Sequence, residues 1–273
     1  MSSNDAQSFL VTGGRGVLGQ QICKALNASP LNHLVTLFPG DINDRPFVRN
    51  FMTSGRGFTH LIHAAAIVPT ILVSSNLKQA YQTNVMGTEN IIAEFLKANP
   101  DGHVSYVSSS HVYGNSKKAI SEATPPEPLG SYGRTKLAGE FVASDVTMSL
   151  KGRICIPRLF SLYSDEQSGS FLLPSLKEKL EASGPKREIE IFGWNNIRDF
   201  STAEFHARAV VHLASNSITG VFNVGSGKGQ SILNFAKNQF KFNLSNKRST
   251  IDPSATSVIA DTSRLLATGF SVE

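Results

Sequence analysis

The pattern of hydrophobic and polar positions near the start of the chain predicts a strand, a glycine-rich turn and a helix, in that order. An apolar run at residues 9–11 is followed by glycines at positions 13, 16 and 19, and apolar side chains then recur at helical spacing from residue 18 to residue 26. A short apolar run bounded by glycines is typical of a buried strand, and a three-to-four-residue period is typical of an amphipathic helix. The turn between the two is a candidate binding loop for a dinucleotide, since that loop requires this order of elements.

Further along the chain, predicted strands alternate with predicted helices. The later strands are expected at residues 34–38, which we predict to be buried, and at 58–66, 104–107, 153–156, 188–192 and 221–224. The later helices are expected at residues 44–54, 72–97, 131–144, 171–180, 202–214 and 231–240, with a short one near the C-terminus. Residues 194–200, which end in R-D-F, are expected to be a loop. The alternation predicts an α/β fold with a Rossmann-type, doubly wound parallel sheet and a small C-terminal substrate lobe.

The predicted domain boundaries follow the point where this alternation loosens, after Arg158. Residues 1–158 are expected to form an NAD(P)-binding Rossmann domain, to which residues 199–224 return. Residues 159–198 and 225–273 are expected to form a small substrate-binding lobe. A chain of 273 residues is long enough for a large domain with such a lobe.

Composition narrows the possible classes of protein. Hydrophobic residues make up 40% of the chain and charged residues 17%, no apolar run approaches the roughly 18 residues of a membrane span, and the first residues lack the parts of a secretory signal. We therefore expect a cytoplasmic protein that does not bind a membrane. Cys23 and Cys155 have no metal-type spacing and are expected to be buried free thiols, so no metal is predicted. The net charge of +5 comes from scattered Lys and Arg, which suits a phosphate-bearing ligand and does not favour nucleic acid.

Each glycine of the first turn has an expected role. Gly13 permits the tight turn, Gly16 lets the backbone approach a pyrophosphate, and Gly19 lets the helix pack close to the strand. The alternative is an ordinary strand-to-helix turn. The acidic residue that ends the second strand of many NAD sites is missing, because that strand ends in Phe38 and Pro39. Arg15 either meets the 2′-phosphate of NADP or is a solvated turn arginine.

Tyr132 and Lys136 are the candidate reacting groups. They lie four residues apart on one predicted helix, so their side chains share a face. A phenol normally titrates near pH 10, and a neighbouring ammonium favours its ionised form, which would bring Tyr132 into range as a proton carrier. The run Ser108 to Ser110 follows a predicted parallel strand, at the sheet edge where ligands bind in such folds, and could orient a substrate oxygen.

At these residues the chain resembles the extended short-chain dehydrogenase/reductase family of NAD(P)-dependent nucleotide-sugar epimerases, dehydratases and ketoreductases. The turn T-G-G-R-G-V-L-G matches the family's T-G-G-x-G-x-x-G, N-V-M-G-T its N-V-x-G-T, and S-S-S-H-V-Y-G its S-S-x-x-V-Y-G. Y-G-R-T-K fits Y-x-x-x-K, R-D-F recurs unchanged, and F-N-V-G-S-G fits Y-N-V-G-S-G. The matches run in family order from Leu10 to about Gly227.

The resemblance implies a catalytic triad of Ser109, Tyr132 and Lys136. It implies a nicotinamide dinucleotide as cofactor and a nucleotide sugar as substrate. Arg15 in the glycine turn favours NADP, with NAD possible. A homodimer formed by the helices that carry Asn84 and Tyr132 is also expected. Asp41 and Ile42 would flank the adenine, Lys136 would also bind the nicotinamide ribose, and Phe160 would lie near the nicotinamide. The full set of expected cofactor-binding residues is Gly13, Arg15, Gly16, Val17, Leu18, Gly19, Asp41, Ile42, Ala64, Ala65, Ala66, Asn84, Tyr132, Lys136 and Phe160.

Several positions depart from the family pattern. The segment before P-G-D-I is too short for a second strand, a helix and a third strand, a compression similar to that of the dTDP-4-dehydrorhamnose reductase branch. Ser110 and His111 stand where dehydratases carry an Asp-Glu pair, which argues against dehydration. His111 is either a second acid or base or a wall or surface residue. Arg198 is either a phosphate contact or part of a structural salt bridge.

The expected reaction moves a hydride between the nicotinamide and a sugar carbon, with Tyr132 carrying the proton, Lys136 lowering its pKa and Ser109 holding the substrate oxygen. Net reduction of a keto-sugar is favoured, because the dehydratase acids are missing and the adenosine region is short. Epimerisation by transient oxidation with bound NAD is the alternative. A non-catalytic dinucleotide sensor is a second alternative, although such proteins usually lose the Tyr or the Lys.

Overall fold

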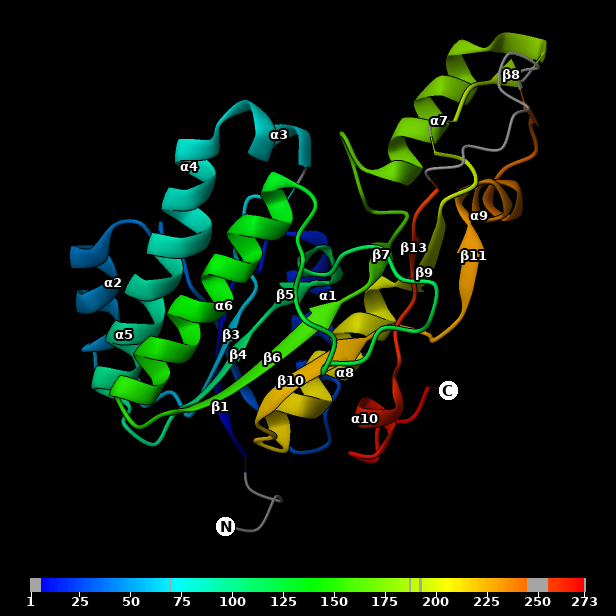
Figure 1. The fold of residues 1–273 in the computed structure, drawn as a ribbon. Helices are drawn as coiled ribbons and strands as arrows, with labels where there is room; N and C mark the ends of the chain where they lie inside the picture. Colours follow the sequence, from blue (N-terminus) through cyan, green and yellow to red (C-terminus); the bar gives the residue numbers. More distant parts are fainter. Residues whose placement is uncertain (1–5, 69, 187, 192, 245–254, 273) are drawn as a thin grey trace.

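The computed structural model describes residues 6–68, 70–186, 188–191, 193–244 and 255–272 and is built around a parallel sheet (Figure 1). The strand order is β10-β6-β4-β3-β1-β2, and β5 adds to β6. Every printed pairing in this sheet is parallel, which confirms the predicted α/β doubly wound fold. The strands are β1 (Ser8–Thr12), β2 (Leu34–Leu37), β3 (His60–His63), β4 (His103–Tyr106), β5 (Ser108–Ser109), β6 (Arg153–Leu159) and β10 (Gly220–Val224).

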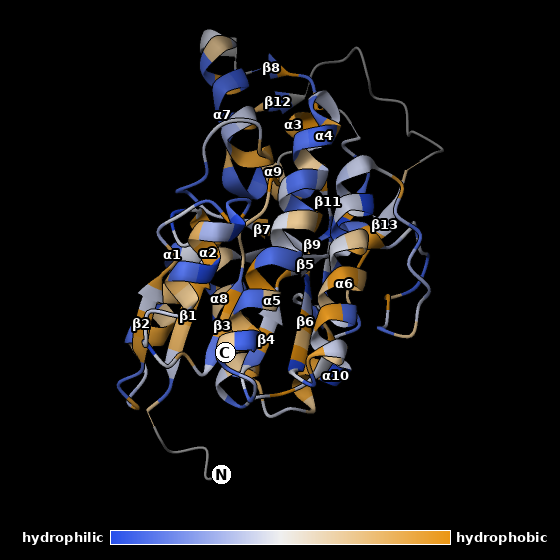
Figure 2. Ribbon diagram, turned by 90° about the vertical axis from the view of Figure 1, so that its left-hand side faces the viewer, coloured by the Kyte–Doolittle hydropathy of each residue, from blue (hydrophilic) through white to orange (hydrophobic). Residues whose placement is uncertain are grey.

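Helices cover both faces of the sheet, and alternate residues of β1 show how. Phe9 and Val11 pack in one core with α1 (Val17–Asn27) and α8 (Ala203–Ser215), whereas Leu10 packs in the opposite core with α2 (Arg45–Met52) and α5 (Thr88–Ala98). Figure 2 shows the apolar colouring of β1 and β6 between these layers. The remaining elements of this part are α3 (Thr70–Ser75), α4 (Leu77–Tyr81), the π-helix η1 (Gln82–Gly87), the 3-10 turn η2 (Ser110–Val112), α6 (Ser131–Ser149) and α10 (Ser263–Leu266).

A second group of elements lies beyond one end of the large sheet, at the upper right of Figure 1. Its four-stranded sheet has the order β11-β9-β13 with β7 added to β9, and β8 pairs with β12 separately. Leu176 and Leu180 of α7 pack with Ile189 and Ala236 in its own small core. The elements are β7 (Ser161–Tyr163), α7 (Leu172–Ala182), η3 (Gly184–Lys186), β8 (Glu188–Ile189), β9 (Ile197–Thr202), β11 (Gly229–Ser231), α9 (Ile232–Gln239), β12 (Asn243–Leu244) and β13 (Ser257–Val258). The domain boundaries at residues 158 and 225 stay a prediction.

Some elements differ from those expected from sequence. Strand β2 is an edge strand and is not buried, since Leu34 is 61% exposed and Leu37 is 46% exposed. The R-D-F segment lies inside β9, because β7, β11 and β13 all pair with that strand. Strand β6 continues through Pro157 to Leu159, and the part of the predicted 188–192 strand at Phe192 lies outside the described residues.

The helix expected over residues 72–97 is divided into four parts. Asn76 caps a new helix, α4, by accepting a hydrogen bond from the Gln79 amide at 3.1 Å, and η1 then widens to π geometry before α5 begins. Gly87 ends η1 where a Cβ would lie 2.7 Å from the Ile42 side chain. The glycine therefore lets the helix pack directly on the loop that precedes α2.

Membrane spans, metal-binding groups and cysteines were all considered in the sequence analysis, and the structure bears on each. Among the described residues, no helix is both long and apolar enough to cross a membrane, and no group of three or more His, Cys, Asp or Glu could hold a metal ion. Both cysteines are free; Cys155 is buried and Cys23 is half-buried.

The buried histidines predict that the fold loses stability in mild acid. Burial lowers the pKa to about 3 for His60, His63 and His206, and to about 4 for His103. The unfolded chain binds protons at these sites near pH 6.5, so the stability present above pH 6.5 is lost as the pH falls toward 4, by up to about 1.4 kcal/mol per pH unit for each histidine. Urea unfolding at pH 7.5, 6 and 5 should show a falling free energy of unfolding.

A matched variant isolates one contribution. Both ring nitrogens of His206 are buried without a hydrogen-bond partner among the described residues. His206→Leu should therefore make the decline between pH 6.5 and 5 less steep, while His60, His63 and His103 keep their contributions. A free energy of unfolding that stays constant over this range in the parent protein would contradict the assignment.

Candidate active site

The glycine turn between β1 and α1 is shaped by close backbone contacts. Gly13 has φ +70°, and a Cβ there would lie 2.7 Å from the backbone of Ala64 and Ala65. A Cβ on Gly19 would collide with the carbonyl oxygen of Gly13. Glycine is thus required at both positions by the chain itself, the first for its left-handed backbone and the second for the approach of α1 to the turn.

The N-terminus of α1 is open to an anion. Gly16 is the N-cap and provides no side-chain cap, and no acidic residue lies in the first turn. The first backbone amides of a helix, here those of Val17 and Leu18, have no partner within the helix and attract negative charge. Arg15 is exposed beside them. These residues fit the pyrophosphate of a dinucleotide, which such amides bind in related folds.

At the adenosine end, the sheet extends only one strand beyond β1. A doubly wound nucleotide-binding sheet has two there in the usual strand order, so the predicted abbreviation is confirmed. Leu37 at the end of β2 lies against Gly14, where a Cβ would be 2.5 Å from the leucine side chain. Asp41 is exposed and accepts a hydrogen bond from the Asn43 amide at 2.9 Å, whereas Ile42 is buried. Their contact with adenine stays a prediction.

The loop after β3 lies directly on the glycine turn. The amide of Ala65 donates to the Thr12 hydroxyl at 3.2 Å, and Ala64 donates to the Thr12 carbonyl at 3.3 Å. Asn84 holds the continuation of this loop: its Oδ1 accepts from the Ile67 amide at 2.8 Å, and its Nδ2 donates to the Ile67 carbonyl and to Thr135 Oγ1, both at 3.0 Å. Both amide hydrogens of Asn84 are used by the chain, which assigns it a positioning role. Direct contact of Asn84, or of Ala64 to Ala66, with a cofactor stays a prediction.

The structure brings the three predicted catalytic residues together. Ser109 ends β5 and Tyr132 lies in the first turn of α6, yet α6 packs against β5 and the Ser109 hydroxyl lies near enough to the Tyr132 phenol to lower its pKa. Lys136 lies one helical turn after Tyr132, and its Nζ sits 4.2 Å from the centre of the Tyr106 ring. All three are buried. Phe160 is also buried, where it packs beside Tyr113, and its proximity to a nicotinamide stays a prediction.

The electrostatics of Tyr132 differ from the sequence-based expectation. Burial raises the pKa of Tyr132 to about 12, and the nearby Ser109 hydroxyl offsets only part of this rise. Burial also lowers the pKa of Lys136 to about 7, against the opposing charge of Glu140. The expected lowering of the tyrosine pKa by the lysine is therefore absent in the chain alone, because the desolvated lysine is itself only partly charged near neutral pH. The phenol of Tyr132 is protonated and ready to donate.

A buried ion pair, which the sequence analysis did not identify, holds α6, the helix that carries Tyr132 and Lys136 and is called the catalytic helix below. Arg158 of β6 binds Glu140 of α6 with two hydrogen bonds, of 2.9 and 2.6 Å, and Ser108 donates to the same carboxylate at 2.5 Å. Arg158 also donates to the Tyr113 hydroxyl at 2.8 Å. Two features of the sequence could have indicated this pair: a glutamate one helical turn after Lys136, and an arginine at the end of an apolar strand.

The two predicted substrate-side residues lie near each other, since the charge of Arg198 affects the pKa of His111. His111 is exposed, its ring centre is 5.3 Å from that of Tyr132, and its Nδ1 is 3.4 Å from Ser109 Oγ. Desolvation by the neighbouring protein lowers the pKa of His111, and the positive charge of Arg198 lowers it further. A role for His111 as a second acid or base stays a prediction.

Arg198 joins β9 to the residue that precedes β13. Its guanidinium donates to the carbonyls of Ile197 and Thr256 at 2.8 and 2.9 Å and to the Thr256 hydroxyl at 2.7 Å. No salt bridge joins Arg198 to an acid within the described ranges, and that alternative stays a prediction. A phosphate contact stays a prediction.

Asp199 organises the V-G-S-G turn that follows β10, and the sequence analysis did not single it out. Its buried carboxylate accepts hydrogen bonds from the Ser226 amide at 2.8 Å, the Gly227 amide at 2.9 Å and the Ala260 amide at 3.2 Å. The R-D-F motif pointed to this residue without showing its purpose. Asp199 ties β9, the V-G-S-G turn and the chain after β13 into one unit.

Residues 9–225 match the model of the NAD dependent epimerase/dehydratase family. The chain belongs to this family. Membership identifies the protein as an enzyme that uses a nicotinamide dinucleotide, and the glycine turn described above has the shape and charge to hold one. The family match ends in the V-G-S-G turn that Asp199 organises.

Individual relatives agree with this assignment. The chain is similar to UDP-glucose 4-epimerase of Halalkalibacterium halodurans, with 28% identity over 267 residues, covering 82% of this chain and 77% of the relative. Its fold is similar to that of RMD from Pseudomonas aeruginosa complexed with NADPH, with TM-score 0.83, 22% identity and coverage of 98% and 94%. It is also similar to MoeE5 in complex with UDP-glucuronic acid and NAD, with TM-score 0.79, 22% identity and coverage of 97% and 94%.

Removal of the buried carboxylate at position 140 should strongly destabilise the protein. Glu140→Gln leaves Arg158 buried without an opposite charge, and we expect a loss of about 3 kcal/mol in the free energy of unfolding. Glu89→Gln is the control, because Glu89 pairs with Arg45 at 3.1 Å on the surface and should lose less than about 1 kcal/mol. Urea titrations at pH 7.5 measure both, and equal losses would show that the buried pair has no special importance.

Proposed function

We propose that this enzyme reduces a keto group on the sugar of a nucleotide sugar, with NADPH as the reductant. The observation that carries the proposal is the closeness of the Ser109 hydroxyl to the Tyr132 phenol, whose pKa it lowers, with Lys136 one turn away on the same helix. A proton donor, a hydroxyl that can hold the carbonyl oxygen and a lysine thus occupy one site. A protein that only sensed dinucleotides would have no use for this arrangement.

The chain's own residues handle the proton. A nicotinamide, when bound, supplies the hydride. Tyr132, kept protonated by a pKa of about 12, donates its proton to the sugar oxygen as the carbonyl is reduced. The Ser109 hydroxyl orients that oxygen, and Lys136 in its charged form stabilises the phenolate that remains. Lys136, whose pKa is about 7, can take this form at neutral pH.

The short adenosine end supports a reductase, because a reductase must release its oxidised cofactor in every turnover. With β2 at the sheet edge and 46% of Leu37 exposed, the described residues form no further strand there to enclose an adenosine. An epimerase, by contrast, recovers its cofactor unchanged and gains nothing from release.

Epimerisation is the second candidate function, supported by the name of the Halalkalibacterium relative. The same Tyr132 would then accept the proton of the sugar hydroxyl and return it. Dehydration is disfavoured, since Ser110 and His111 stand where an acid pair would be needed.

The substrate proposal rests on charge near the site and on the relatives. MoeE5, a structure of similar fold, is complexed with UDP-glucuronic acid. In this chain Arg198 is half-buried and lies close enough to His111 to affect its pKa, which suits a diphosphate beside the sugar. For the cofactor, exposed Arg15 is available to a 2′-phosphate, and the Pseudomonas neighbour is complexed with NADPH. A cytoplasmic location stays a prediction.

Turnover with a defined substrate tests the function. With NADPH and a 4-keto nucleotide sugar, absorbance of the reduced nicotinamide should fall, and it should fall faster than with NADH. Tyr132→Phe removes the proton donor and should lower kcat at least about 100-fold while NADPH affinity is kept. Tyr81→Phe removes an exposed hydroxyl and should have no effect.

The result also separates the candidates. A change of sugar stereochemistry without net oxidation of NADPH would instead establish the epimerase. Turnover by Tyr132→Phe at the parent rate would exclude Tyr132 as the proton carrier.

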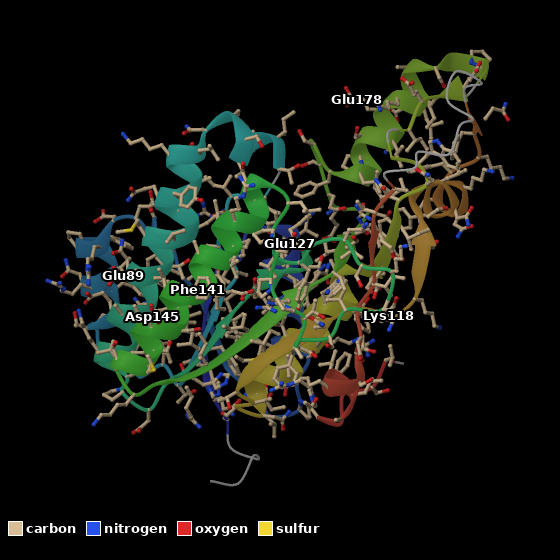
Figure 3. The ribbon with its side chains drawn as sticks, viewed as in Figure 1. Glu89, Lys118, Glu127, Phe141, Asp145 and Glu178 are labelled. Atoms are coloured by element: carbon tan, nitrogen blue, oxygen red, sulfur yellow. The ribbon has the colours of Figure 1, made fainter. Side chains whose placement is uncertain are left out.

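We further propose that the protein is a homodimer joined through α4, η1 and α6. Exposed apolar side chains gather on these elements: Phe141 is 62% exposed, Met148 75%, Met86 52% and Leu77 45%. Figure 3 shows Phe141 pointing outward from α6. A partner that covers these side chains would remove a large apolar area from water.

A charge in this patch should therefore dissociate the dimer. Phe141→Glu should halve the mass measured by light scattering, because two glutamates would be buried in the interface. Leu266→Glu, at an exposed apolar position on α10, should leave the mass unchanged. A monomeric parent protein would refute the proposal.

A further inference from the structure

A continuous line of buried polar groups connects the glycine turn to the catalytic helix. Thr12 Oγ1 lies 2.6 Å from His63 Nδ1, and His63 Nε2 lies 3.0 Å from Thr88 Oγ1. The Thr88 hydroxyl donates to the Asn84 carbonyl at 2.9 Å. From Asn84 the line continues through Thr135, whose hydroxyl donates to the Tyr132 carbonyl at 2.8 Å.

The direction of each hydrogen bond is fixed by the groups at the ends. The Thr88 hydroxyl has one hydrogen and gives it to the Asn84 carbonyl, so its oxygen can only accept from His63, and Nε2 must carry the hydrogen. At the other end, Thr12 already accepts from the Ala65 amide at 3.2 Å. Its own hydrogen is free to be donated to Nδ1 of a neutral His63 ring.

The contacts of His63 also oppose a second proton. To bind one at Nδ1, the Thr12 hydroxyl would have to turn its hydrogen away from the ring. The charged groups and rings that face His63 come from two elements: Lys136 of α6, whose positive charge repels a protonated ring, and Tyr106 of β4, whose ring centre is 5.8 Å away. Burial adds to the same effect, since His63 is 1% exposed.

We propose that His63 is a positioning residue, held as the neutral Nε2–H tautomer, that sets the catalytic helix at a fixed distance from the nucleotide-binding turn. The proposal rests on the function proposed above, because the distance matters only if Tyr132 acts on a substrate beside a bound dinucleotide. His63 itself is assigned no contact with substrate or cofactor. It acts through Thr12 on the turn and through Thr88 and Asn84 on the helix that carries Tyr132. A fully satisfied buried network of this kind holds its members in one arrangement.

The first test reads the ring directly and needs no activity. In ¹⁵N-histidine spectra the His63 signals, assigned by their loss in His63→Asn, should report protonated Nε2 and unprotonated Nδ1 without change from pH 8 to pH 5. If that variant does not fold, contacts to the Thr12 and Thr88 methyl groups assign the ring instead. A charged ring, or the Nδ1–H tautomer, would overturn the proposal.

The second test breaks one link. Thr88→Val removes the acceptor of the Nε2 hydrogen, and we expect kcat to fall about tenfold with little change in KM for the sugar, because a small displacement of catalytic groups slows the reaction. Thr88→Ser restores the hydroxyl and should restore kcat. Thr147→Val is the matched control, since Thr147 is also buried in a helix and donates to the carbonyl four residues earlier, at 2.7 Å, but has no histidine partner.

The outcomes are distinct from those for the proposed function. If Thr88→Val and Thr147→Val have the same kcat, the positioning role is wrong even where the reductase is established. If the parent protein reduces no keto-sugar, the same comparison is made on the ring spectrum. Thr88→Val should then change the tautomer signals of His63 and Thr147→Val should not, and an unchanged His63 spectrum in Thr88→Val would overturn the proposal.

Discussion

The ion pair between Glu140 and Arg158 fixes the catalytic helix on the sheet. Glu140 lies one turn beyond Lys136, and its carboxylate also accepts a hydrogen bond from Ser108, the neighbour of Ser109. One buried contact therefore aligns both sides of the site. Because an unpaired charge in this position would be strongly unfavourable, helix and strand end are held in a single relative position. The closeness of the Ser109 hydroxyl to the Tyr132 phenol depends on that position.

Desolvation of Tyr132 and Lys136 sets the chemistry of the site. Tyr132 and Lys136 are shielded from water, so the neutral forms of both are favoured, with the pKa of the phenol raised to about 12 and that of the amine lowered to about 7. A neutral phenol is a proton donor, and reduction of a carbonyl requires one. Lys136, which is partly charged near neutral pH, can stabilise negative charge that develops on the Tyr132 oxygen.

Much of the fold could be predicted from sequence, because its signals are local. The apolar run before Gly13 and the helical period after it specify β1 and α1, and Tyr132 and Lys136 share a face through helical spacing alone. Features that depend on distant contacts could not be predicted. Whether β2 is buried depends on a further strand beside it, which the described residues do not form, and R-D-F becomes a strand only because β7, β11 and β13 pair with it. The pKa of Tyr132 likewise depends on burial by the folded protein.

The central claim is that the glycine turn and the Ser109, Tyr132 and Lys136 group serve one bound dinucleotide. A crystal structure with NADPH tests it most directly. The account predicts the pyrophosphate at the α1 amides after Gly16, and the nicotinamide beside the side chains of Tyr132 and Lys136. A dinucleotide bound elsewhere, or a nicotinamide remote from the Tyr132 hydroxyl, would contradict it.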